Sequence, residues 1–255
     1  MLVVSLDQFD NASSTRHQGA LVRSDGAVAA EGLDFAGSVR LPVSIAEEGV
    51  FRFRFGGEAS NAVKVAKGAR GPYWGDIHIH TKLSSDAQGT DPYGYARDVA
   101  GLDFAATCDH WQSLGPEGYR ITAEWARAAN EPGRFVTLLA HELNPPEWTG
   151  HHNVYFSSEE AFLRHAAVKG GSGFLHPDNP SAEAPSPDEV MVIPHHTGIL
   201  FSAFDGTKRG NAVDLDAADD LGLRPAMEVY SHHGQSESYA PQHVLAYEFN
   251  RMRTP

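Results

Sequence analysis

The stretch GDIHIH at residues 75–80 decides how this chain folds and what it can bind. Side chains along a β-strand alternate between its two faces, so His78 and His80 project from the same face. Two imidazoles one strand step apart can hold a single divalent ion. The alternative is a pair of buried histidines with purely structural partners, but at the end of a strand we favour metal ligands.

Four further apolar runs stop at residues that can bind a metal. They are FAATCDH, ending at Asp109 and His110, FVTLLAHE, ending at Glu142, VMVIPHH, ending at His195 and His196, and AMEVY, which contains Glu228. A β/α barrel gathers its chemistry at the carboxyl ends of its strands. Five such runs in series therefore predict a metal-dependent hydrolase.

Residues 71–255 alternate strand, loop and helix and are expected to form one hydrolase domain. Helices are predicted at 91–100, 117–130, 161–168 and 243–252. The first opens with Asp91 as cap and Pro92 at its first position. A capping box of Ser157 and Glu160 opens the third. Strands that alternate with helices favour a mostly parallel sheet or barrel.

Residues 1–70 are predicted to be a separate β-rich segment. Phe51, Phe53 and Phe55 alternate with arginines, which is the period of a half-buried strand. Shorter strands are expected within 20–23, 39–45 and 62–66, between turn-forming residues. Because nothing here has catalytic spacing, we interpret this segment as a packing element or cap.

Charge is unevenly distributed along the chain. The first 70 residues hold eight basic and eight acidic side chains, so the 12 basic and 25 acidic residues that follow carry the whole net charge of −13. Such a surface repels a polyanionic backbone, which argues against a nucleic-acid partner. Bound divalent cations would still make a pocket locally positive.

Other features exclude further classes. The single cysteine, Cys108, rules out an intrachain disulfide and is expected to be a small buried hydrophobe. No run approaches the ~20 apolar residues of a membrane span. The start of the chain has neither the basic flank nor the apolar length of a signal peptide, which slightly favours a cytoplasmic protein unless the sequence is a fragment without its leader; the sequence does not predict the compartment.

The ordered set of motifs resembles the PHP family, the metal-dependent phosphoesterases named for polymerase-associated and histidinol-phosphatase members. The matching pieces are HIH (His78, His80), Asp86, CDH (Asp109, His110), AHE (Glu142), GHHNVY (His151) and IPHH (His195). An uncharacterised branch with a β-rich segment before the first motif is most similar, through YWGDIHIHT, ARDVAGLDF and YSHHGQSE. The resemblance covers residues 73 to about 240.

The resemblance implies a distorted (β/α) barrel of PHP type with up to three ions. By it, His78, His80 and Glu142 hold the first ion. Glu142 bridges to a second ion, which His151 and His195 complete. The third site starts from Asp86 and His110.

Two histidine doublets leave alternatives open. Spacing against the family favours His151 over His152 and His195 over His196, and either neighbour is a candidate for substrate contact. A third candidate for the pocket is His233, with His232 beside it. Asp109 is expected to orient a ligand histidine rather than to bind metal itself.

One motif of the family is missing. After His196 the sequence has no Asp followed two residues later by His, whereas the family closes with D-x-H. Either the chain is a fragment or this branch closes the site differently. The first and third ions would each lose a ligand, so we expect at most two well-held ions and an incomplete barrel.

The expected activity is hydrolysis by a metal-activated water, with a small phosphorylated molecule as substrate. Zinc, manganese and iron all suit imidazole with carboxylate. An amidohydrolase-like C–N hydrolase is the second interpretation, because that class also begins with H-x-H at a strand end. The third is a non-catalytic PHP-like binding module with a degenerate metal site. The sequence does not predict the oligomeric state.

Overall fold

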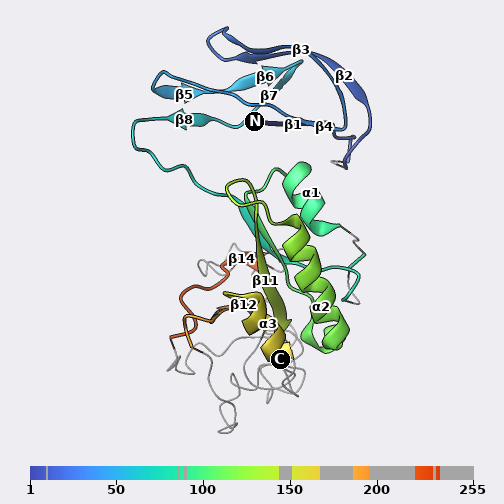
Figure 1. Cartoon of the computed structure of the whole chain (residues 1–255). Coiled ribbons are helices and arrows are strands. Elements are labelled where there is room, and N and C mark those ends of the chain that lie inside the picture. Colours follow the sequence, from blue (N-terminus) through green and yellow to red (C-terminus); the bar gives the residue numbers. More distant parts are fainter. Residues whose placement is uncertain are drawn as a thin grey trace, which may run out of the picture. The chain divides into compact units, whose positions relative to one another are not determined.

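The computed structural model describes residues 1–9, 11–84, 87–88, 91–143, 151–166, 186–195, 222–231 and 234–235 (Figure 1). The chain divides into two compact units. The first comprises Met1–Gly75 with Gly94–Asp103, and the second comprises Asp76–Tyr93 with Phe104–Pro255. Together the described residues form a mixed α/β structure in which strands outnumber helices.

The first unit contains eight short strands. They are β1 (Leu2–Val4), β2 (Arg16–Arg23), β3 (Val28–Ala36), β4 (Ser38–Arg40), β5 (Gly49–Phe51), β6 (Phe53–Phe55), β7 (Glu58–Ala59) and β8 (Val63–Val65). Strands β3, β2, β6 and β7 form a four-stranded sheet in that order, while β1 pairs with β4 and β5 with β8. All of these pairings are antiparallel.

The single strand predicted over Phe51–Phe55 is wrong. Strand β5 ends at Phe51 and β6 begins at Phe53, and the two belong to different sheets. Between them the Arg52 carbonyl accepts a hydrogen bond from the Ser24 amide at 2.7 Å, and the Arg52 amide donates to the Ser24 hydroxyl at 3.2 Å. The strand is divided because β5 pairs with β8 whereas β6 pairs with β2. The alternation itself holds, since Phe53 is buried and Arg54 is exposed.

The second unit is built on a five-stranded sheet in the order β13-β12-β11-β10-β9. Its strands are β9 (Gly75–Ile79), β10 (Phe104–Thr107), β11 (Val136–Leu143), β12 (His152–Phe156) and β13 (Val190–Pro194). Strands β10 and β11 are parallel, whereas β11–β12 and β12–β13 are antiparallel. Two short strands, β14 (Tyr230–Ser231) and β15 (Gly234–Gln235), pair with each other.

This sheet is more mixed than the predicted one. Only the eight residues 144–151 separate β11 from β12. A parallel crossover needs a dozen or more residues, so a direct antiparallel return is the short solution. Within the described part of the chain the sheet runs from β13 to β9 without closing, and a complete barrel is not seen there.

Among the described residues three helices accompany the strands: α1 (Pro92–Asp98), α2 (Trp111–Ala129) and α3 (Glu159–Ala166). Within α2, Gly115 adopts φ 53° and separates one short turn from the main helix, which has Pro116 at its start. The cap of α3 is Ser158 rather than Ser157, because the Ser158 hydroxyl accepts the Ala161 amide at 3.1 Å. No helix among the described residues is both long and apolar enough to cross a membrane. The predicted helix at 243–252 lies outside those residues.

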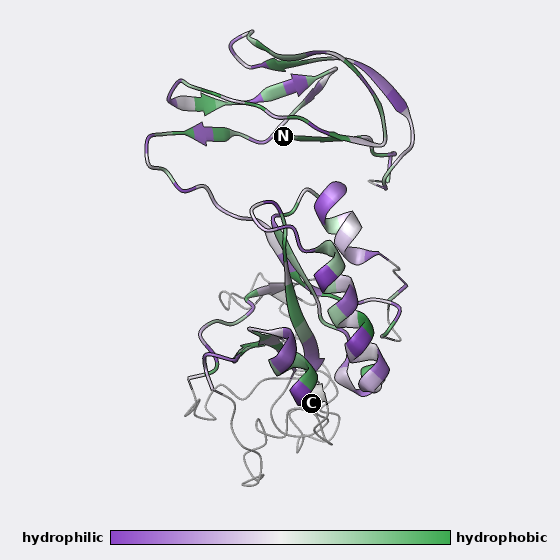
Figure 2. Cartoon of the chain, in the orientation of Figure 1, coloured by the Kyte–Doolittle hydropathy of each residue, from purple (hydrophilic) through white to green (hydrophobic). Residues whose placement is uncertain are grey.

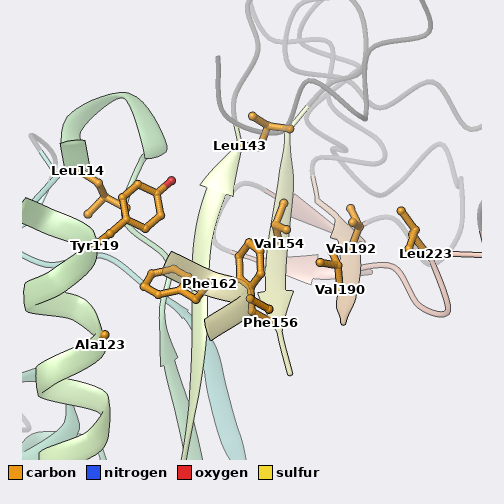
Figure 3. Packing of buried hydrophobic residues seen from close by; sticks show 11 residues of the cluster. Leu114, Tyr119, Ala123, Leu143, Val154, Phe156, Phe162, Val190, Val192 and Leu223 are labelled. Carbon is orange, nitrogen blue, oxygen red and sulfur yellow. The ribbon is translucent and has the colours of Figure 1, made fainter. Parts of the chain in front are cut away.

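One face of the sheet carries the main hydrophobic core, beneath α2 and α3 (Figure 3). Phe162 of α3 is fully buried there, with Tyr119 of α2 and Phe156 of β12 around it at ring-centroid distances of 5.0 and 5.3 Å. Figure 2 shows β11 coloured mainly as hydrophobic, while α2 carries hydrophilic and hydrophobic residues together. This packing holds the strands in place from one side.

The opposite face carries a smaller cluster and, beyond it, polar side chains. Ala106, Cys108, Ala140 and Tyr155 form the cluster. Cys108 is completely buried and burial raises the pKa of its thiol, which donates to the Ile77 carbonyl at 3.2 Å. Side chains along β11 alternate between the two faces of the sheet, so the residue two positions after Ala140 lies on this same face. That residue is Glu142.

Candidate metal centre

Glu142, at the end of β11, is the centre of a histidine cluster. Its side chain is only 4% exposed. One carboxylate oxygen, Oε2, lies 3.0 Å from His80 Nε2, 2.9 Å from His110 Nε2 and 3.7 Å from His78 Nε2. The first two strands of the unit deliver these rings, since β9 ends beside His80 and a parallel bridge joins the backbones of His110 and Glu142.

The other carboxylate oxygen faces a different set of rings. Glu142 Oε1 lies 2.8 Å from His151 Nδ1 and 3.1 Å from His195 Nε2. His151 directly precedes β12 and His195 directly follows β13, and the His195 amide donates to the His151 carbonyl at 3.2 Å. The two antiparallel strands therefore bring both rings to the same oxygen. Five imidazoles thus surround one carboxylate, divided between its two oxygens.

Among the described residues, two groups have ligand atoms within 4.8 Å of one another and could hold a metal ion. They are His78–Glu142–His195 and His80–His110–Glu142. Ring-centroid distances show the same grouping, at 4.5 Å between His78 and His195 and 4.7 Å between His80 and His110. This differs from the pairing of His78 with His80 that the resemblance implies, although those two rings are also close, at 5.3 Å.

Burial and neighbouring charges shift the pKa values of this cluster in opposite directions. Burial alone would raise the pKa of Glu142, but hydrogen bonds from the surrounding histidines hold the pKa well below its usual range. Burial would lower the pKa of His78, but the Glu142 and Glu228 carboxylates outweigh it and raise the pKa to about 9. For His195 burial dominates and lowers the pKa to about 4. The carboxylate is therefore ionised, and the cluster offers both a protonated and a neutral imidazole.

Asp109 holds the loop that follows β9. Its carboxylate accepts the Thr81 amide at 2.7 Å, the Thr81 hydroxyl at 2.8 Å and the Ser84 hydroxyl at 2.7 Å. The Ser84 oxygen also lies 3.2 Å from His80 Nδ1 and accepts the His110 amide at 3.0 Å. Since Ser84 donates to Asp109, it can accept the Nδ1 proton of His80, which makes Nε2, the nitrogen directed at Glu142, the ring atom that could bind an ion.

Other histidines of the sequence motifs lie elsewhere. His152 pairs with Leu143 and Pro194 in the sheet, so its side chain points to the helix-covered face, where it is fully buried. His141 lies on that face too, with its Nδ1 3.1 Å from the Tyr119 hydroxyl. Three predicted candidates, Asp86, His196 and His233, lie outside the described residues.

The sequence singled out Glu228 as a residue that can bind a metal but did not place it in the site. Glu228 precedes β14, and its Oε2 lies 3.4 Å from His78 Nδ1, on the side of the ring away from Glu142. The AMEVY run indicated a strand ending at this residue, but no partner for it could be named from the sequence. The spatial neighbour, His78, is 150 residues earlier in the chain.

Comparison with known proteins adds little to this geometry. No protein-family model and no curated protein sequence matches the chain. A solved structure from Bifidobacterium adolescentis, described as a "putative metal-dependent phosphoesterase", is similar over 63% of this chain and 79% of its own, with 16% identity and a TM-score of 0.37. At that level of similarity, a function for this chain has to be argued from its own residues.

Proposed function

We propose that this protein is a metal-dependent hydrolase that cleaves phosphoesters. The observation that carries the proposal is the division of the Glu142 carboxylate, with His151 and His195 at Oε1 and three other imidazoles at Oε2. A carboxylate so placed can join two ions, one at each oxygen. Two ions bridged in this way are the common apparatus of phosphoester hydrolysis.

The donor set suits divalent cations of the first transition row. Neutral imidazole with carboxylate binds zinc, manganese and iron alike, so the ligands do not select one of them. Five imidazoles and one carboxylate supply too few donors to saturate two ions, and a catalytic centre needs open positions for water and substrate.

The two oxygens of Glu142 suggest how the ligands would be shared. His151 and His195 would hold one ion with Oε1. His80 and His110 would hold the other with Oε2. His78, which lies close to both His80 and His195, would complete one of the two sites. Asp86 stays a candidate for a third ion. As expected from the sequence, we propose at most two well-held ions.

The surrounding residues would keep the site in shape for catalysis. When bound, the divalent ions supply Lewis acidity, which lowers the pKa of water toward neutrality and stabilises charge on a phosphoryl oxygen. Asp109 and Ser84 orient His80, while Glu142 offsets part of the ions' positive charge. A strongly acidic chain would otherwise repel a phosphorylated substrate, so the ions would also provide the attraction that binds it.

Metal analysis and turnover test this proposal together. Purified protein would be analysed for bound zinc, manganese and iron, and assayed with p-nitrophenyl phosphate under added Mn²⁺ or Zn²⁺. We expect bound metal and metal-dependent release of p-nitrophenol, both strongly reduced in Glu142→Gln. His17→Asn, which changes a histidine of the first unit, is the matched control and should alter neither.

Three results would contradict the proposal or redirect it. Absence of bound metal at any supply would rule it out. Cleavage of amide substrates in preference to phosphoesters would favour the amidohydrolase-like interpretation. Tight metal binding without turnover of either substrate class would favour a binding module, because the cluster would then serve only to hold ions.

A further inference from the structure

The segment that carries Glu228 is anchored to the edge of the five-stranded sheet. The Val192 amide donates to the Leu223 carbonyl at 2.7 Å, and the Glu228 amide donates to the Pro194 carbonyl at 3.0 Å. Leu223 is almost fully buried in the main core. The segment therefore runs alongside β13 in the same direction, and its last hydrogen bond positions Glu228 next to the residue before His195.

His78 lies between two carboxylates that face different ring nitrogens. Its Nδ1 is 3.4 Å from Glu228 Oε2, whereas its Nε2 is 3.7 Å from Glu142 Oε2. The His78 and Glu228 side chains are 22% and 23% exposed, so the contact is mostly shielded from solvent. Of the two carboxylates, Glu228 belongs to neither group of close ligand atoms found among the described residues.

A neutral imidazole has one N–H and one lone pair, and a metal can take only the lone pair. A carboxylate close to Nδ1 favours the proton on that nitrogen and leaves Nε2 as the ligand atom. Histidines that bind metal commonly donate their second ring N–H to such a partner, which fixes the tautomer and the ring orientation. For His80 the equivalent partner is the Ser84 hydroxyl, which Asp109 supports.

We propose that Glu228 is a positioning residue, which holds His78 in the Nδ1–H tautomer and so presents Nε2 to an ion at Glu142. The inference deepens the proposed function and rests on it. It assigns to the AMEVY run a task in a site whose family-like closing motif, D-x-H, does not occur after His196 in this sequence. In this role Glu228 would not bind an ion itself but would strengthen a ligand that is already there.

Zinc binding and histidine ¹⁵N spectra test this role without any activity assay. The His78 signals of zinc-saturated protein would be assigned by their loss in His78→Gln. In the wild type we expect a protonated Nδ1 and a zinc-bound Nε2. In Glu228→Ala we expect zinc to bind about 10-fold to 100-fold more weakly, with a second His78 form in which Nδ1 binds the ion.

Two further variants complete the experiment. Glu228→Gln keeps an acceptor oxygen without the charge, so it should keep the wild-type tautomer and weaken zinc binding by about threefold or more, because charged hydrogen bonds are about twice as strong as neutral ones. Glu160→Gln removes an exposed carboxylate of α3 and should match the wild type. Circular dichroism checks that each variant folds. If Glu228→Ala does not fold, the result for Glu228→Gln decides whether Glu228 positions His78.

The outcomes separate this inference from the proposed function. Zinc binding to His78 in the wild type, with unchanged affinity and a single His78 form in both Glu228 variants, would overturn the positioning role and leave the metal centre standing. A wild type that binds no zinc, with His78 signals unaffected by the ion, would overturn both.

Discussion

His110 and Glu142 are joined twice. An isolated parallel bridge links their backbones, and their side chains meet at 2.9 Å between Nε2 and Oε2. The pair therefore depends on the register of β10 and β11, which places Thr107 beside Leu139 and the following residues side by side. The register of β10 and β11 therefore determines both the strand pairing and the position of His110 relative to Glu142 in the candidate metal site.

The first prediction follows from that pair. His110→Ala should leave the sheet folded, because the backbone bridge does not need the ring, but should weaken metal binding at Oε2. We expect at least about a tenfold rise in the zinc dissociation constant, comparable to the loss of a supporting ligand contact. Calorimetric titration measures it. Unchanged affinity in a folded variant would remove His110 from the site.

The neighbours His151 and His152 should respond to substitution in different ways. His151→Ala should lower the bound metal and also cost some stability, since its ring is 13% exposed and lies 2.8 Å from the buried Glu142 Oε1, which would lose that partner. His152→Ala should keep the metal in the folded protein but lower the free energy of unfolding by about 2–4 kcal/mol, because it empties a fully buried position on the helix-covered face. Metal analysis and urea unfolding measure the two effects. A reversed pattern would mean that the doublet is assigned wrongly.

Asp109→Asn should affect both the loop and the metal site. The amide cannot accept from the Thr81 amide, the Thr81 hydroxyl and the Ser84 hydroxyl as a carboxylate does, and hydrogen bonds to a buried charge are worth about 1.5–3 kcal/mol. We expect the free energy of unfolding to fall by about that amount. Zinc should also bind more weakly, because His80 loses its support. Ser84→Ala is the comparison, since it removes the contacts of one hydroxyl with His80, Asp109 and the His110 amide but leaves both Thr81 bonds to Asp109 in place. It should weaken zinc binding with a smaller loss of stability.

Much of the site could be predicted from the sequence. Period-two alternation placed His78 and His80 on one face, and runs ending in Asp109, Glu142 and His195 indicated strand ends, which meet at one edge of a sheet. Strand-end position could not decide between His151 and His152. That choice depends on which face of β12 is covered by helices, a property of the tertiary packing.

The rest depends on contacts between distant residues. Whether β11 and β12 pair parallel or antiparallel is a matter of sheet topology, and the sequence pattern of strand, loop and helix favoured the parallel answer. Glu228 could be recognised as the end of an apolar run, but not as the partner of His78, because nothing local connects them. For Phe51–Phe55 the period was right, yet the strand is divided because β5 pairs with β8 and β6 pairs with β2, a choice of partner that the local sequence does not contain.

Zinc binding should release a proton from His78. In the metal-free protein the pKa of His78 is raised to about 9, so the ring is protonated at pH 7.5, whereas a ligand nitrogen must be free of its proton. Apparent affinity should therefore rise with pH, by up to about tenfold per pH unit from this group, until about pH 9. Titration calorimetry in two buffers of different ionisation enthalpy counts the protons. His78→Gln should release about one proton fewer, and an equal count would contradict the assignment.

The pKa values of His78 and His195 are shifted in opposite directions, so the two residues should make the stability of the metal-free protein depend on pH in opposite ways. The pKa of His78 lies above its ordinary 6.5, so the stability it contributes is complete below pH 6.5 and is lost as the pH rises toward about 9. The pKa of His195 lies below 6.5, at about 4, so its contribution is present above pH 6.5 and is lost as the pH falls.

Urea unfolding of chelator-treated protein tests both signs by difference, since subtracting each variant from the wild type removes the titration of groups outside the histidine cluster. The difference in unfolding free energy between wild type and His78→Gln should shrink from pH 6.5 to 9. That between wild type and His195→Gln should shrink from pH 6.5 to 4. If the His78 difference grew toward alkaline pH instead, the two carboxylates would not be stabilising a protonated His78, and the contact with Glu228 would have to be a neutral one.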